Sequence, residues 1–209
     1  MQAIISHTNR YIYYYTPKVA CTTIRKMLAQ FEGIPWYHPW DHRKVRFNYI
    51  NTEASYVISY FKFAFVRNPW DRLVSCYFDK VVGVRAKPDN VAIKDGIFRC
   101  FIPYNRDFKT MGFPEFAEFV CSLSDDESNG HFRSQHTFFN HSAMDFVGRF
   151  ENLTGDLEEL RNKMGIKNIK EEHLMSSKHK NYKDYYNKEL IDMVGDRFQK
   201  DIKLFGYEF

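Results

Sequence analysis

The feature that most constrains the fold is a short strand-like run followed at once by a helix-like pattern, which occurs twice in the first half of the chain. Residues 11 to 15 (YIYYY) are aromatic and β-branched, and Pro17 ends the run. From Ile24 onward, apolar residues recur at i, i+3, i+4 and i+7, which predicts one face of a helix. The second instance is the apolar run YFKFAFV, which suits a buried strand and is followed directly by RNPWDRLVSCYFDKV. In that segment Asn68 can cap a helix whose first turn holds Pro69.

A third junction and two further helices complete the pattern. MDFVGRF has strand character, and ENLTGDLEELRNKMGI carries a helical apolar face that Gly165 should end. FPEFAEFVCSL predicts a packing helix, and a single carboxy-terminal helix should stop at Gly206. Residues 83 to 112 lack strong periodicity and predict a long surface excursion. The alternation of strands and helices predicts a three-layer α/β fold with a central, mainly parallel sheet flanked by helices.

Length and composition are those of one folded domain. The chain has 209 residues, of which 44% are hydrophobic and 18% aromatic, so we expect a single domain over 1–209 with a substantial core. Cysteines at 21, 76, 100 and 121 show no CxxC spacing, and reduced thiols are the simpler interpretation. We find no signal-peptide pattern and no apolar run long enough for a membrane span, which predicts a cytoplasmic protein.

The loop at the first junction has the residues of an oxyanion site. A strand-to-helix loop presents unpaired backbone N–H groups at the positive end of a helix dipole, and here Lys18 adds a charge while Thr22 and Thr23 add hydroxyls. The alternative is that a threonine only caps the helix and that Lys18 is solvated. An ATP-type phosphate loop needs glycines and a lysine immediately before the Ser/Thr, and this loop has neither.

The second junction offers a matching set of donors. Arg67 ends the predicted strand and can fork two hydrogen bonds onto a phosphate, while Ser75 adds one more donor. The alternative pairs Arg67 with Asp71 and leaves Ser75 on a solvated face. Because parallel strands end at the same edge of a sheet, both junctions should lie at the carboxyl edge. Together they predict a ligand with two separated anionic groups, which the modest net charge of +4 suits.

On these motifs the chain resembles the PAPS-dependent sulfotransferases, and in particular the carbohydrate branch related to chondroitin and dermatan 4-O-sulfotransferases. The resemblance rests on PKVACTTIRKML, FVRNPWDRLVSCY, HFRSQ, DFVGRFENL and the terminal LFGYEF, which cover most of the chain in order. It implies a P-loop-like α/β fold and transfer of a sulfuryl group from PAPS, 3′-phosphoadenosine 5′-phosphosulfate, to a hydroxyl of a glycan or glycoconjugate. Adenosine 3′,5′-bisphosphate would be the second product, and no metal would be required.

The resemblance also implies roles for individual residues. Lys18 would contact the 5′-phosphosulfate and serve catalysis, and Arg67 with Ser75 would hold the 3′-phosphate. The full set of expected PAPS contacts is Lys18, Cys21, Thr22, Thr23, Arg67, Ser75, Arg149 and Phe150. Ala20 stands where the family usually has glycine, and a positive φ at this position would strain an alanine.

The acceptor hydroxyl would also need a general base, for which the pKa of histidine is suitable. His38 and His42 lie between the first helix and the second strand, where related heparan sulfotransferases place their histidine base. The alternative is that both are surface histidines in an aromatic loop. His131, with Arg133 and Gln135 of HFRSQ, is expected beside the acceptor or PAPS. Acceptor contacts are expected from the irregular loops at 34–56 and 83–112.

Two other functions remain open from the sequence alone. An atypical P-loop-like nucleotide or sugar kinase would also use a phosphate-binding loop after the first strand, and it would require Mg²⁺ with ATP. A non-catalytic binder of acidic polymers would use the lysine, arginine and aromatic residues. Under the favoured interpretation the partner is a glycan or glycoconjugate, with neither nucleic acid nor a membrane span involved. The sequence leaves the oligomeric state open.

Overall fold

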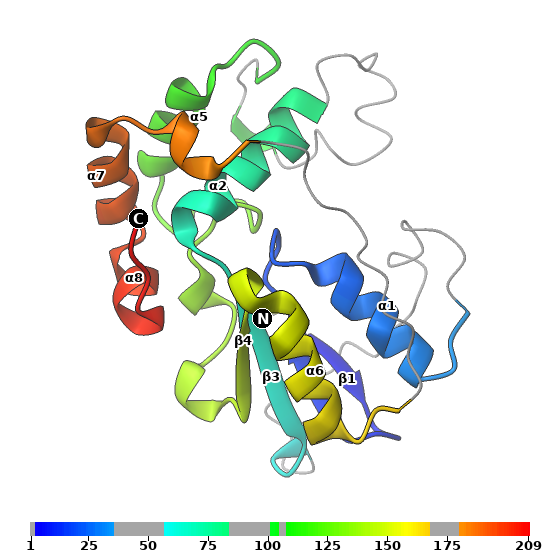
Figure 1. Cartoon of the computed structure of the whole chain (residues 1–209). Helices are drawn as coiled ribbons and strands as arrows, with labels where there is room; N and C mark the ends of the chain where they lie inside the picture. The colour runs from blue at the N-terminus through cyan, green and yellow to red at the C-terminus, as the bar shows by residue number, and fades with distance from the viewer. Residues whose placement is uncertain (1–2, 36–56, 84–100, 105–107, 168–179) are drawn as a thin grey trace. The chain divides into compact units, whose positions relative to one another are not determined.

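The computed structural model describes residues 3–35, 57–83, 101–104, 108–167 and 180–209 (Figure 1). The chain forms two compact units, each assembled from two separate segments. The first unit comprises Met1–Arg67 and Phe138–Ser176, and the second comprises Asn68–Thr137 and Ser177–Phe209. The boundary between Arg67 and Asn68 separates strand from helix at the second predicted junction. A single sulfotransferase domain over the whole chain stays a prediction.

The first unit contains the sheet. Its four strands lie in the order β1 (Ala3–Ser6), β2 (Tyr11–Tyr14), β3 (Phe61–Val66) and β4 (Phe146–Arg149). β2, β3 and β4 run parallel, and β1 is antiparallel to β2 at one edge. The three parallel strands are those expected from the sequence, whereas β1 was not anticipated. The predicted α/β fold with a mainly parallel sheet flanked by helices is therefore confirmed.

Two helices cover one face of this sheet, α1 (Cys21–Phe31) and α6 (Leu153–Met164), both labelled in Figure 1. Alternate residues of β2 and β3 point toward them, as the period of two in a strand requires. The resulting core contains Tyr11, Tyr13, Ile24, Met27, Leu28, Phe63, Phe65 and Leu160. Burying each large apolar side chain stabilises the fold by roughly 1.5–3 kcal/mol. Gly148 faces this core, since a Cβ there would lie 2.3 Å from Cε1 of Phe65.

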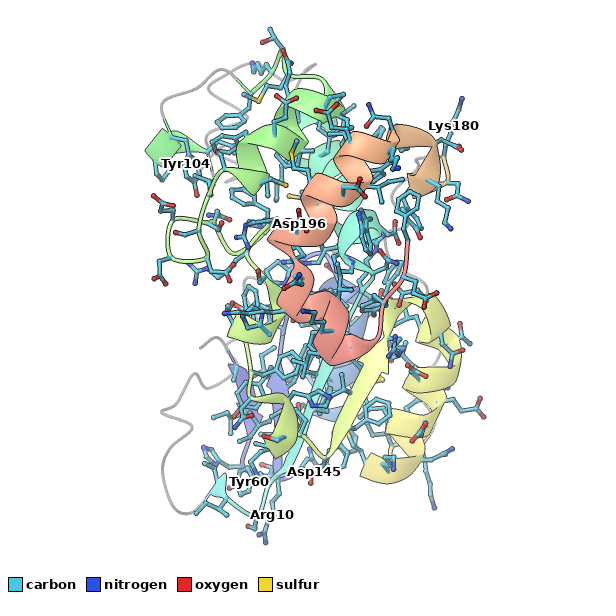
Figure 2. The ribbon with its side chains drawn as sticks, turned by 90° about the vertical axis from the view of Figure 1, so that its left-hand side faces the viewer. Arg10, Tyr60, Tyr104, Asp145, Lys180 and Asp196 are labelled. Carbon is cyan, nitrogen blue, oxygen red and sulfur yellow. The ribbon has the colours of Figure 1, made fainter. Side chains whose placement is uncertain are left out.

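The third predicted strand-to-helix junction, after β4, is present in the structure. The β4 strand is followed by the short helix η8 (Phe150–Asn152) and then α6, which stops at Gly165 in a left-handed conformation. A further short helix, η7 (His141–Ala143), precedes β4. At the opposite, amino edge, Arg10, Tyr60 and Asp145 precede the three parallel strands and lie near one another in Figure 2.

The second unit is helical in its described residues. Its longer helices are α2 (Pro69–Tyr77), α5 (Phe113–Cys121), α7 (Lys188–Arg197) and α8 (Gln199–Phe205). Short helical segments are η3 (Phe78–Val82), η5 (Ile102–Tyr104), η6 (Gln135–Thr137) and η9 (Tyr182–Tyr185). Aromatic residues dominate its core, among them Trp70, Tyr77, Phe101, Phe108, Phe113, Phe116, Phe119 and Phe132. As predicted, Asn68 caps α2, because its Oδ1 accepts a hydrogen bond from Trp70 N at 3.1 Å.

The carboxy-terminal helix differs from the prediction, because it is broken into α7 and α8. Phe198 leaves the helical region at φ −105° and ψ 22° between them. Beyond the break, Asp201 is fully buried and accepts hydrogen bonds from the backbone N–H groups of Gln135 and His136 at 2.6 and 2.8 Å. A polar anchor inside the core therefore replaces the continuous apolar face that the spacing suggested. α8 stops at Gly206 as expected.

No helix among the residues that the structure describes is both long enough and apolar enough to cross a membrane. The cytoplasmic location stays a prediction.

Candidate anion-binding site at the carboxyl edge of the sheet

The site is set by the carboxyl ends of the three parallel strands. Tyr14 pairs with Ala64, and Val66 pairs with Arg149, so the chain leaves β2, β3 and β4 at the same edge. Ligands of open α/β sheets bind at this edge, where loops and helix N-termini present backbone N–H groups. The loop at 15–20 belongs to the first unit, as do Arg67 and Phe150.

The loop before α1 holds an unusual backbone conformation. Lys18 has a φ of 70°, and Ala20 has φ 47° and ψ 24°, both in the left-handed region. Ala20 is the N-cap residue, and its carbonyl accepts a hydrogen bond from Ile24 N at 3.1 Å. The positive φ foreseen as a source of strain at Ala20 is therefore present.

The first turn of α1 contains no acidic residue that would compensate the positive end of the helix. Cys21, Thr22 and Thr23 form that turn and are half-buried, and the turn contains no acidic residue. The N-cap residue is Ala20, which makes no side-chain capping bond, so neither threonine occupies the cap position. The N-terminus of α1 therefore keeps the dipole and the donors that attract an anion.

Arg67 joins the second junction to this loop. The residue is only 4% exposed, and its Nη1 donates a hydrogen bond to the carbonyl oxygen of Lys18 at 3.1 Å. Its Cζ also lies 3.8 Å from the centroid of the Phe150 ring, a close cation–π contact. Arg67 therefore contacts both the lysine loop and Phe150, although the three come from separate parts of the sequence.

The junction after β4 is fixed by a carboxylate. Asp156 accepts a hydrogen bond from the backbone N–H of Arg149 and a second from the Asn152 side-chain amide, the latter at 2.7 Å. Arg149 is exposed, and Phe150 begins the short helix η8. These bonds hold the aromatic ring of Phe150 where the Arg67 guanidinium stacks on it.

Burial dominates the electrostatics beneath the loop. It raises the pKa of the Tyr13 hydroxyl well above its usual range, and nearby Cys21 raises the same pKa further, whereas the cation of Arg25 lowers it. Tyr15 also raises the Tyr13 pKa. Tyr13 therefore stays protonated, and Arg25 is identified as a cation close to the loop that the sequence had not singled out.

Some predicted site residues belong to the second unit or lie outside the described residues, and their roles stay predictions. Ser75 lies on α2 in the second unit, where it is 3% exposed. His38 and His42 lie outside the described residues, as does most of the 34–56 and 83–112 loops. Among the described residues, no group of three or more His, Cys, Asp or Glu side chains could hold a metal ion.

HFRSQ has a structural role in the second unit that the sequence did not reveal. Arg133 donates from Nε and Nη2 to the carbonyl oxygen of Ser128, at 3.1 and 2.9 Å. Arg72 donates to the carbonyl oxygens of Arg133 and Gly130, at 2.7 and 3.2 Å, and Gln135 is fully buried. These contacts hold the segment in the core of the second unit.

Parallel strands here lead into a cationic, glycine-free loop, and the arginine that follows the next strand is bonded to that loop, which is an arrangement suited to an oxyanion. More specifically, the chain belongs to the sulfotransferase family, because the model of that family matches residues 1–208. No solved structure matches the chain at a significant level.

Curated relatives carry related names. Carbohydrate sulfotransferase 10 of Xenopus laevis is 28% identical over 98% of this chain and 66% of its own length. Carbohydrate sulfotransferase 14 of Homo sapiens is 27% identical over 75% of this chain and 45% of its own length. Carbohydrate sulfotransferase 11 of Mus musculus is 28% identical over 73% of this chain and 50% of its own length. The chain thus spans about half to two thirds of the length of these relatives, and the predicted resemblance to the carbohydrate branch is confirmed.

Proposed function

We propose that this protein transfers a sulfuryl group from PAPS to a hydroxyl of a glycan or glycoconjugate and releases adenosine 3′,5′-bisphosphate. Membership of the sulfotransferase family supports the reaction. The names of the relatives, all carbohydrate sulfotransferases, support the class of acceptor.

The observation that carries the proposal is the hydrogen bond from Arg67 to the carbonyl oxygen of Lys18. It supports a shared site in which the lysine loop receives the 5′-phosphosulfate and Arg67 receives the 3′-phosphate. A guanidinium has five N–H donors, so Arg67 can bond the Lys18 carbonyl and a phosphate at once. Phe150, stacked on Arg67, would provide an aromatic surface near the adenine.

In the proposed reaction the acceptor oxygen attacks sulfur, forming a new S–O bond, while the bond from sulfur to the 5′-phosphate oxygen breaks. The electron pair of the broken bond stays on that phosphate oxygen, where negative charge develops. The ammonium of Lys18 and the N–H groups of Cys21, Thr22 and Thr23 would stabilise this charge, which is differential stabilisation of the transition state. His38 or His42 would accept the proton that the acceptor hydroxyl loses.

Nucleotide binding tests the proposal directly. We expect adenosine 3′,5′-bisphosphate at 100 times its Kd to stabilise the protein by about 2.7 kcal/mol, which raises the Tm by roughly 5–10 °C in a chain of this size. ATP, with or without Mg²⁺, lacks the 3′-phosphate and should shift the Tm far less. A larger shift with ATP and Mg²⁺ would favour the kinase alternative instead.

Turnover tests the role of Lys18. We expect Lys18→Ala to reduce radiolabelled sulfuryl transfer from PAPS to a panel of glycans by about 100-fold or more, which is typical when a group that stabilises developing charge is removed. Arg67→Ala should mainly raise the KM for PAPS. The matched control is Lys163→Ala, since this lysine lies exposed on α6 and pairs with Glu159 at 3.5 Å. Equal turnover by Lys18→Ala and Lys163→Ala would refute the assignment.

A further inference from the structure

Arg25 is a buried cation beside the loop that carries Lys18. It lies on α1 and is only 7% exposed, and its Cζ lies 4.1 Å from the centroid of the Tyr15 ring. Its Nε is buried without a hydrogen-bond partner. Within the part of the chain that the structure describes, no carboxylate pairs with Arg25, and the first turn of α1 contains no acid.

A buried guanidinium whose Nε lacks a hydrogen-bond partner lowers the stability of the folded protein when no ligand is bound. Removing a cation from water is costly unless a counter-charge and hydrogen bonds replace the lost hydration, and buried polar groups are almost always bonded. The stack on Tyr15 supplies part of that compensation but offers no acceptor to Nε. The missing acceptor is therefore expected to come from a ligand.

The position of Arg25 identifies which ligand group it would meet. Helical side chains lean toward the helix N-terminus, so a residue in the second turn of α1 reaches back to the loop. Contact with Tyr15, the residue that opens the loop after β2, confirms this direction. Two other buried side-chain atoms without partners flank the same loop, the Tyr13 hydroxyl and Thr16 Oγ1.

We propose that Arg25 is an anion-binding residue of the phosphosulfate loop, which completes its hydrogen bonding on the 5′-phosphoryl oxygens of the nucleotide. The inference rests on the proposed function and adds a residue to its site. Lys18 then stabilises the phosphate oxygen whose bond to sulfur breaks, while Arg25 binds the phosphate from the side of α1. Because the charge of Arg25 is already desolvated, its attraction to the anion is screened less than that of a surface arginine.

The experiment compares two nucleotides and two arginines by titration calorimetry. Adenosine 3′,5′-bisphosphate carries the 5′-phosphate, and adenosine 3′-monophosphate lacks it. The variants are Arg25→Met, which keeps an apolar side chain against Tyr15, and the control Arg10→Met. Arg10 is exposed at the amino edge of the sheet, where its Nη2 bonds Ser59 and its Cζ lies 5.7 Å from the Tyr60 ring centroid (Figure 2).

We expect Arg25→Met to weaken binding of the bisphosphate at least about tenfold, which corresponds to about 1.4 kcal/mol. Binding of the 3′-monophosphate should change less than about twofold, and Arg10→Met should leave both affinities unchanged. Arg25→Lys should restore part of the loss, because it keeps the charge but not the planar fork. Without nucleotide, Arg25→Met should melt at the same temperature as the wild type or higher, since it removes an uncompensated buried charge.

Each other result counts against the proposal. Unchanged bisphosphate affinity in Arg25→Met would overturn it while leaving the proposed function intact. A lower melting temperature or an unfolded Arg25→Met protein would also overturn it, because the guanidinium would then be part of the fold's own support. If the wild type itself does not prefer the bisphosphate, the proposed function fails and this inference fails with it.

Discussion

Replacing Ala20 with glycine should stabilise the protein, although glycine usually weakens helices. Ala20 holds φ 47° and ψ 24° at the N-cap of α1. A residue with a Cβ pays roughly 1–2 kcal/mol in the left-handed region, and glycine pays almost nothing. The greater freedom of glycine in the unfolded chain offsets about 0.4–1 kcal/mol of that gain. The net effect is about 0.5–1 kcal/mol, which raises the Tm by roughly 1–4 °C for a chain of this length.

The control is the same substitution nine residues farther along α1. Ala29 lies in the helix interior and is fully buried. Ala29→Gly loses about 1 kcal/mol of helix propensity and about 0.8 kcal/mol of methyl burial, so its Tm should fall by roughly 4–8 °C. Scanning calorimetry of the wild type and both variants, without nucleotide, measures the two changes under one set of conditions.

Opposite signs for the two substitutions are the critical result. Equal destabilisation by Ala20→Gly and Ala29→Gly would refute the left-handed assignment, because only an ordinary helical conformation at residue 20 would make glycine unfavourable there. An unchanged Tm in Ala20→Gly would mean that the strain only matches the entropy offset of about 0.4–1 kcal/mol.

Two further predictions concern the second unit. Asn68 caps α2 and also donates a hydrogen bond from Nδ2 to the carbonyl oxygen of Glu208 at 2.8 Å. In denaturant unfolding, Asn68→Ser, which can still cap, should lower the free energy of unfolding by about 1 kcal/mol, and Asn68→Ala should lower it by about 2 kcal/mol. Burial alone would raise the pKa of Asp125, but hydrogen bonds from Ser134 and Arg197 outweigh it and hold that pKa below the ordinary 3.8. The ionised Asp125 carboxylate therefore stabilises the fold above pH 3.8, and this stabilisation is lost as the pH falls through the lower pKa of the folded state. Asp125→Asn should consequently make the decline of stability below about pH 4 shallower.

Local chemistry explains how much of the fold could be predicted. The strands YIYYY and FKFAFV and the caps at Asn68 and Gly165 depend on neighbouring residues alone, and the structure contains each of them. The short strand β1 was missed because its pairing with β2, and not a strong local pattern, makes it a strand. The break at Phe198 was missed because the buried Asp201 takes its hydrogen bonds from residues more than sixty positions away.

The same distinction applies to the site. Lys18 and Arg67 could be predicted because each lies where a strand ends, and parallel strands bring such positions to one edge. The bond between Arg67 and the Lys18 carbonyl could not be predicted, because it depends on the left-handed backbone at Lys18. Arg25 was overlooked because it follows Ile24 directly, and a basic residue beside an apolar helical face is usually solvated.

Two unfavourable features therefore meet at one loop, a strained alanine and a buried arginine to which the described residues offer no counter-charge. Neither is required to build the sheet or α1, since glycine and an apolar residue would satisfy those positions better. Backbone strain and buried unpaired charges are found mainly at functional sites, because selection for stability alone would remove both features. Strain at Ala20 and desolvation of Arg25 both lower the stability of the protein, and a bound anion would relieve only the second. Bound nucleotide should consequently reverse the stability order of wild type and Arg25→Met while leaving the advantage of Ala20→Gly in place.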